Sequence, residues 1–151
     1  MADWAGAVAA MRARLEGGFN AAPVEYQNED PPQQPWPPAS APWIFFEVIE
    51  TQTTQRGVGT PGNKPWLTVG HMFAHVFAPK GYGLPDHLAI AGAIMTLYRG
   101  ATFYNTDPDA KVVCIGADGA GPSVQGGDSK SGDGNQFGVT VAIPFQFYFT
   151  A

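Results

Sequence analysis

The chain has 151 residues, of which 44% are hydrophobic and 13% aromatic, so it can form one domain around a single buried core. Its 19 glycines and 14 prolines favour a β-rich fold with long loops over a helical bundle. Only 14% of the residues are charged, and a formal net charge of −5 leaves no basic patch for a phosphate backbone. The composition therefore argues against direct nucleic-acid binding, and the low charge density fits a surface that partner subunits cover.

The single cysteine, Cys114, excludes an intramolecular disulfide and any multi-cysteine metal site, as is typical of a reducing cytoplasm. Within KVVCIG its side chain is expected to be a small buried hydrophobe rather than a nucleophile. The N-terminus lacks the basic and apolar regions of a signal peptide, and no apolar run reaches the ~18 residues of a membrane span. We therefore expect neither classical secretion nor membrane contact.

The first part of the chain predicts a helix, a short strand and a connector. Asp3 can cap a helix over 3–16, where apolar residues recur at helical spacing before a pair of glycines. The segment PVEYQN at 23–28 alternates apolar and polar residues, as a short strand does. Residues 29–42 hold six prolines and predict a rigid, extended connector rather than a recognition motif for an SH3-type partner.

The middle of the chain predicts two strands and a helix. The segment WIFFEVIETQ at 43–52 is typical of a central strand, whereas 53–65 has no apolar period and is expected to be a loop. Residues 66–78 predict the next strand. Residues 84–100 predict a helix that Asp86 caps. Its predicted apolar stripe consists of Leu88, Ala91, Met95 and Tyr98.

The last part of the chain predicts short strands at 101–104 and 111–117, with a turn (NTDPD) between them. Residues 118–135 predict a loop rich in glycine and aspartate that no core could bury. A long strand is expected at 137–149, because apolar residues occupy every second position. These residues are Phe137, Val139, Val141, Ile143, Phe145, Phe147 and Phe149.

Two histidines four residues apart, His71 and His75, lie in the strand predicted at 66–78. On a strand they point the same way but lie about 13 Å apart at ~3.3 Å per residue, too far to share one zinc ion. On a helix they would be neighbours, but Met72 stands where an HExxH motif needs Glu. The sequence therefore predicts no metal site. The pair belongs to one apolar stripe: Leu67, Val69, His71, Phe73, His75 and Phe77.

Three aspartates, Asp118, Asp128 and Asp133, lie among the glycines of the predicted 118–135 loop. An EF-hand needs acidic ligands at alternate positions and a terminal Glu, and a glycine-rich calcium repeat needs a hydrophobic residue in each turn. Neither pattern is present. The sequence favours a solvated hairpin or an assembly loop over a calcium site.

Patterns for cofactor binding or catalysis are weak. GADGAG at 116–121 lacks the Gly-Lys-Ser/Thr of a Walker loop, and Pro122 follows it where a dinucleotide fingerprint needs a helix. The sequence shows no GxSxG elbow and no convincing set of Ser, His and acidic residues. We therefore expect no cofactor, no catalytic residues and no enzyme activity.

A series of segments in the order of the chain carries a resemblance to a known family. After the N-terminal helix come PVEYQNEDPP, PWIFFEV, RGVG, LTVGHMFAHVFAPKGYG, a helix ending in LYRG, and VTVAIPFQFYF. This series resembles the tail-terminator family of long-tailed bacteriophages, the group around the lambda tail terminator, with relatives in gene transfer agents. The resemblance extends over most of the chain and rests on pattern features, not on catalytic signatures.

The resemblance implies an α+β fold, with a mixed or antiparallel sheet packed against two helices and with long Gly/Pro-rich loops. It also implies a homo-oligomer, usually a ring of six subunits, on the end of the tail tube. The ring would stop tube growth, offer a surface to the head–tail connector or stopper protein, and let DNA pass without specific binding. The protein would be a structural part of the virion tail, assembled in the host bacterial cytoplasm.

Candidate assembly residues follow from this resemblance and from the patterns above. A ring interface needs two different apolar or edge surfaces on one subunit, and glycines around Arg56 would let the 53–65 loop order upon docking. The histidine stripe either packs under the protein's own helices or faces a neighbouring subunit, where protonation would make assembly sensitive to pH near ~6.5. The candidates are Arg56, Gly57, Gly59, Lys64, Trp66, His71, His75, Asp128 and Asp133.

Two alternatives stay open. Another head–tail joining or minor tail protein of similar fold would share the same general features. A small β-rich ligand-binding protein or enzyme would need convergent polar groups in an apolar pocket, for which His71 and His75 are the available candidates.

Overall fold

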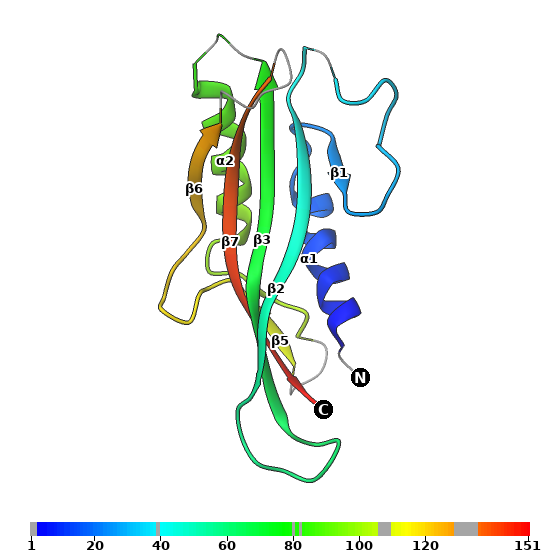
Figure 1. Ribbon diagram of the computed structural model, residues 1–151, viewed down its shortest axis with the longest axis vertical. Coiled ribbons are helices and arrows are strands. Elements are labelled where there is room, and N and C mark those ends of the chain that lie inside the picture. Colours follow the sequence, from blue (N-terminus) through cyan, green and yellow to red (C-terminus); the bar gives the residue numbers. More distant parts are fainter. Residues whose placement is uncertain (1–2, 39, 80, 82, 106–109, 129–135) are drawn as a thin grey trace.

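The computed structural model describes residues 3–38, 40–79, 81, 83–105, 110–128 and 136–151. In this part of the chain, two helices lie behind a curved sheet of seven strands in the view of Figure 1. The fold is α+β, as the sequence predicts. The elements are α1 (Trp4–Gly18), β1 (Val24–Tyr26), β2 (Trp43–Gln55), β3 (Pro65–Pro79), α2 (Pro85–Tyr98), β4 (Thr102–Phe103), β5 (Lys111–Val113), β6 (Ser123–Asp128) and β7 (Gln136–Thr150).

The sheet is built around three long strands, β2, β3 and β7, which pair antiparallel along nearly their whole length. Strand β1 pairs parallel with β2, so the sheet is mixed. The far edge of β7 is shared, because β6 pairs with its first half and β5 with its last residues. The strand order is β1-β2-β3-β7-β5-β4, with β6 beside β7.

Helix α1 begins where the sequence predicts. The Asp3 carboxylate accepts a hydrogen bond from the amide of Gly6 at 2.8 Å, which satisfies one of the free N–H groups of the first turn. Residues spaced by four, Ala7, Met11 and Leu15, are fully buried against the sheet. Burial of this stripe fixes the helix to the core, since a helix of this length gains most of its stability from packing.

Helix α2 is confirmed as an element, but two details of its prediction are wrong. Leu84 occupies the N-cap position without a side-chain hydrogen bond, and Asp86 lies in the first turn, where its charge favours the helix dipole. Pro85 starts the helix because the first turn needs no N–H from it. The buried face of the helix also differs from the predicted apolar stripe, because Leu88 is exposed. The buried residues are His87, Ile90, Ala91, Ile94 and Tyr98.

Three predictions in the β regions also differ from the structure. The strand predicted at 111–117 is shorter, since β5 ends at Val113 and a turn follows. Strand β2 continues to Gln55, because Gln52 to Gln55 pair with β3 beyond a bulge at Thr51. The predicted 118–135 loop contains strand β6, because Ser123, Val124 and Gln125 pair with the exposed edge of β7. Residues 106–109, most of the predicted turn, and 129–135 lie outside the described residues.

The core lies between the helices and the sheet. On β7 the predicted stripe is confirmed from 139 to 147, where the odd-numbered residues are buried on the helix side. Phe137 and Phe149, at its two ends, are half-buried, and Ala142 and Pro144 on the opposite face are buried as well. On β3 it is the even-numbered residues that face the helices. The strand residues of this core are Ile44, Phe46, Met72, Ala74, Val76, Val139, Val141, Ile143, Phe145 and Phe147.

Candidate functional site

Both predicted histidines lie on the face of the sheet opposite the two helices, as the alternating burial of β3 shows. On β3, His71, Phe73 and His75 are half-buried, while their even-numbered neighbours are fully buried on the helix side. The histidine stripe therefore does not pack under the protein's own helices. We call this surface the open face, defined by Phe45, Glu47, His71, Phe73, His75 and Thr140.

A row of stacked rings crosses the open face. The ring centroids of Phe45 and His75 lie 6.1 Å apart, those of His75 and Phe73 6.1 Å, and those of Phe73 and His71 5.6 Å. The ring of Phe73 therefore lies between the two imidazoles. This arrangement agrees with the strand spacing from which we inferred that His71 and His75 cannot share a metal ion.

His75 makes a hydrogen bond to each neighbouring strand. Its Nδ1 lies 2.9 Å from the hydroxyl of Thr140 on β7, and its Nε2 lies 2.8 Å from Oε1 of Glu47 on β2. The tautomer protonated at Nε2 satisfies both contacts, with Nε2–H donating to Glu47 and the Thr140 hydroxyl donating to Nδ1. The side chains of His75 and Glu47 keep about a quarter of their surface exposed, 29% and 25%.

Thr140, His75 and Glu47 form a row of a hydroxyl, a base and an orienting carboxylate, as in enzymes with an activated nucleophile. This row could not be recognised in the sequence. The residues are distant in the chain, and only the register of β2, β3 and β7 brings them together. Acyl transfer would also need N–H donors aimed at a developing oxyanion. Strands β3 and β6 pair with β7 on the two sides of Thr140. The backbone of Thr140 is therefore engaged in the sheet and does not supply such a donor.

The proline-rich connector contacts one end of the open face through aromatic side chains. The ring of Trp36 packs edge-on against Trp43, and Trp43 stacks on Phe77 with centroids 4.4 Å apart. Trp36 also donates its indole N–H to Glu25. The side chain of Gln136 accepts a hydrogen bond from Trp43 Nε1 at 2.6 Å. The connector is thus anchored to this end of the face by aromatic contacts and hydrogen bonds.

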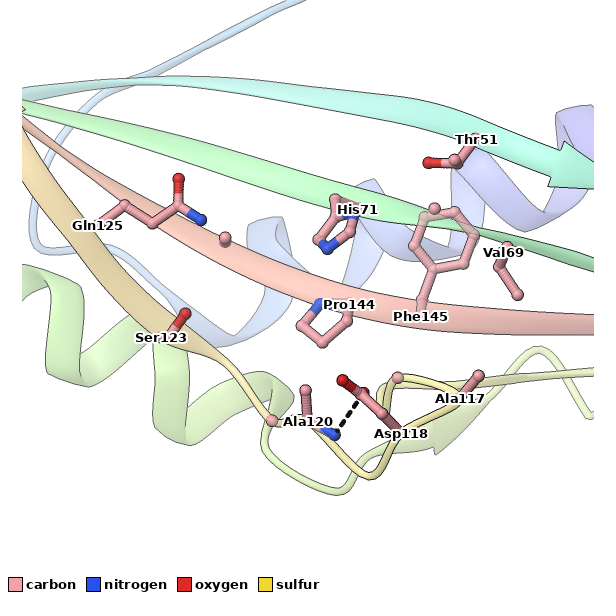
Figure 2. A pocket seen from close by; sticks show the side chains of 14 residues that line it. Thr51, Val69, His71, Ala117, Asp118, Ala120, Ser123, Gln125, Pro144 and Phe145 are labelled. Atoms are coloured by element: carbon pink, nitrogen blue, oxygen red, sulfur yellow. Dashed lines mark hydrogen bonds between the residues drawn. The ribbon is translucent and has the colours of Figure 1, made fainter.

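A pocket of about 300 Å³ lies at the other end of the open face (Figure 2). Figure 2 shows His71 and Pro144 on its sheet side and a turn carrying Ala120 and Asp118 opposite them. Many of the lining residues are small. The lining consists of Thr51, Val69, Gly70, His71, Gly116, Ala117, Asp118, Ala120, Gly121, Ser123, Gln125, Ala142, Pro144 and Phe145.

The turn that walls the pocket is ordered by its own hydrogen bonds. Gly116 donates its amide to the carbonyl of Ala120 at 2.8 Å, and Gly119, with a φ of +84°, donates to the carbonyl of Gly116. The Asp118 carboxylate accepts from the amide of Ala120 at 3.1 Å, the dashed line in Figure 2. The GADGAG segment is therefore a closed turn that presents a carboxylate at the pocket.

The loop between β2 and β3, which we call the tip (56–64), extends beyond the sheet at the bottom of Figure 1. At its base, Arg56 donates its amide to the carbonyl of Pro65 at 2.8 Å. Lys64 and Ala151 exchange two backbone hydrogen bonds of 2.9 Å each, which join the tip to the end of the chain. Val58 is 94% exposed.

The structure separates the predicted assembly residues into groups. Arg56, Gly57, Gly59 and Lys64 lie together in the tip, and Trp66 lies next to it, donating its indole N–H to the carbonyl of Ala151 at 3.2 Å. His71 and His75 lie on the open face, and Asp128 pairs with Gly138 at the end of β6. Asp133 lies outside the described residues. The exposure of Val58 and the pocket could not be predicted from the sequence, because neither has a motif.

Two titratable side chains, Cys114 and Tyr98, are buried in the core, away from the open face. Burial raises the pKa of the Cys114 thiol to about 12, so the side chain is a packed hydrophobe, as its sequence context predicts. Burial also raises the pKa of Tyr98 above its usual range, and its hydroxyl donates to the carbonyl of Met11 at 2.7 Å. Both residues belong to the core.

Within the residues that the structure describes, no three His, Cys, Asp or Glu side chains come together as a metal site would need. Among the same residues, neither helix has the length and apolar character needed to cross a membrane.

Comparison with known proteins supports the fold of the chain but identifies no function. No family model and no curated protein matches the chain. Eight solved chains match it. One of them, which bears only an identifier as its name, is 17% identical with a TM-score of 0.58, over 91% of this chain and 92% of that chain. At this identity the likeness establishes that the two chains share an α+β fold.

Proposed function

We propose that this chain is a tail terminator of a bacteriophage or phage-like particle such as a gene transfer agent. In this role it forms a ring, expected to have six subunits, on the end of the tail tube. The ring stops tail polymerisation and joins the tail to the head connector, and DNA passes through it. The protein would then reside in the virion tail after assembly in the host cytoplasm.

The observation that carries this proposal is the presence of two different candidate contact surfaces on one subunit. The open face has half-buried aromatic rings and an adjacent pocket, and the tip extends beyond the sheet between β2 and β3 (Figure 1). A ring needs such a pair, because each subunit contacts one neighbour with one surface and the next neighbour with the other. The sequence segments that resemble tail terminators include both surfaces.

The proposal is tested with the purified chain by light scattering after gel filtration and by negative-stain electron microscopy. Closed rings with a central hole, or rings that cap tail tubes when the two are mixed, are the expected result. A ring that needs the tube end in order to assemble is detected only in the mixture with tubes, so both assays are needed. A chain that stays monomeric at all concentrations and leaves tubes uncapped would contradict the proposal.

Another head–tail joining or minor tail protein of similar fold is the nearest alternative. Both proteins would form assemblies through the same surfaces, but they differ in what they bind. A terminator binds the end of the tail tube and limits tube length. A chain that binds purified connector but neither caps tubes nor limits their length would favour this alternative.

The contacts of His75 favour a second alternative, a small hydrolase. The Thr140 hydroxyl and the Glu47 carboxylate hold opposite nitrogens of one imidazole, as in a nucleophile, base and acid arrangement. Esterase and peptidase substrates would test this idea, with Thr140→Val as the variant that removes only the hydroxyl. Turnover that disappears in Thr140→Val would support a hydrolase over an assembly protein.

A further inference from the structure

Val58, at the tip, has an unusually exposed apolar side chain. It is 94% exposed, whereas the other large hydrophobic residues exposed on the described surface range from 37% to 46%. A single exposed apolar residue is common on protein surfaces. This one, however, lies on an ordered scaffold, which gives it a defined position.

Backbone contacts fix the conformation of the tip. Its base is closed by the hydrogen bonds of Arg56 and Lys64 described above, and Asn63 donates its amide to the carbonyl of Thr60 at 2.9 Å. A Cβ atom on Gly59 would lie 2.2 Å from the carbonyl oxygen of Asn63, so the two sides of the tip approach closely. A surface held in this way loses little conformational entropy on binding.

The pocket on the open face is large enough for a side chain such as that of Val58. Its volume of about 300 Å³ can receive a branched aliphatic side chain, and much of its lining is glycine and alanine. The tip of the same chain cannot enter it. From Pro65 to Gly70 the rigid ladder of β3 spans about 17 Å at ~3.3 Å per residue, which keeps the tip away from its own pocket.

Charge is complementary between the tip and the pocket. The segment 51–65, which contains the tip, has two cations, Arg56 and Lys64, and no acidic residue. The pocket lining has a carboxylate, Asp118, and no lysine or arginine. Opposite charges at the edge of an interface steer association and fix register more than they add affinity.

We propose that the tip of one copy docks into the pocket of a second copy of this chain. Val58 enters the pocket, and Arg56 faces Asp118 at its edge. The two surfaces differ, so the contact is head to tail and repeats around a closed ring. This inference rests on the proposed ring and identifies the surfaces that form it.

The test uses two variants, each of which blocks one half of the contact. Val58→Asp places a charge on the tip, and Ala120→Trp fills the pocket from an exposed position, so neither change disturbs the core. Each variant alone is expected to be monomeric by light scattering where the wild-type chain forms rings. Mixed together they are expected to form dimers and nothing larger, because only one intact tip and one intact pocket can meet. Circular dichroism checks that both variants are folded.

A charge exchange tests the register of the contact. Arg56→Asp and Asp118→Arg each bring like charges together and are expected to weaken ring formation at least about tenfold, and the double variant to restore it. Leu88→Asp is the matched control, because Leu88 is an exposed apolar residue at 46% on α2, away from both surfaces. It is expected to leave assembly unchanged.

The outcomes separate this inference from the proposed function. Rings of Val58→Asp alone, or a mixture of folded variants that stays monomeric, would overturn the tip-to-pocket contact and leave the terminator proposal standing. A wild-type chain that forms no rings in solution or on tubes would overturn both.

Discussion

The Nε2 atom of His75 lies 2.8 Å from Oε1 of Glu47 on the open face of the sheet. The two residues are 28 positions apart in the chain and meet because β2 and β3 pair antiparallel. Each side chain keeps about a quarter of its surface exposed, 29% for His75 and 25% for Glu47. Water therefore screens this contact, and it is an ion pair only when the imidazole carries a second proton.

Replacing Glu47 by Gln should have a small effect on stability. The amide oxygen of Gln can still accept a hydrogen bond from Nε2–H of His75, and the site is partly exposed, so the free energy of unfolding should change by less than about 1 kcal/mol. Urea denaturation of both proteins measures the difference. A loss much larger than this would mean that the carboxylate charge, which Gln lacks, stabilises the fold.

Gly70 is expected to tolerate no side chain. A Cβ atom there would lie 2.2 Å from the carbonyl oxygen of Ile49 and 3.0 Å from the ring of Phe145. Gly70→Ala should therefore separate β2 from β3 beside the bulge and cost about 1–3 kcal/mol of unfolding free energy. Gly17→Ala is the control, because a Cβ there meets nothing within 4 Å, and it should stabilise α1 by up to about 1 kcal/mol. Equal effects of the two changes in thermal denaturation would contradict this.

The elements of the fold could be predicted where one face of an element is apolar and the other is not. On β7, Val139 and Val141 alternate with less apolar neighbours, and the structure buries them as expected. On β3 both faces are apolar, so the pattern could not tell that Met72 faces the helices and Phe73 the open face. In the structure, the register of β3 with β2 and β7 determines which of its residues face the helices.

The site was less predictable than the fold, because it depends on contacts between distant segments. His71 and His75 could be placed on one stripe from their spacing, but the partners of His75 come from other strands. Strand β6 was missed because its glycines do not favour a strand, and the free edge of β7 supplies the pairing. The pocket beside it could therefore not be foreseen.

Alkaline pH should destabilise the fold, with the first loss due to Cys114. Burial raises the pKa of this thiol from 9.0 to about 12. Above about pH 9 the unfolded chain therefore releases a proton that the folded chain keeps, and stability falls by about 1.4 kcal/mol per pH unit. Buried Tyr98, whose pKa is also raised, adds a second loss only above its ordinary value of 10. Cys114→Ala should flatten the pH profile of urea denaturation between about pH 9 and 10. An unchanged slope would contradict this.

Removing the hydroxyl of Tyr98 should weaken the contact between the two helices. This hydroxyl donates to the carbonyl of Met11 at 2.7 Å in a fully buried site, so it links α2 to α1. Tyr98→Phe should lower the free energy of unfolding by about 1 kcal/mol. Tyr104→Phe is the matched control, because the Tyr104 hydroxyl accepts a longer bond of 3.3 Å from the exposed amide of Asp3. A larger loss in the control would contradict the assignment.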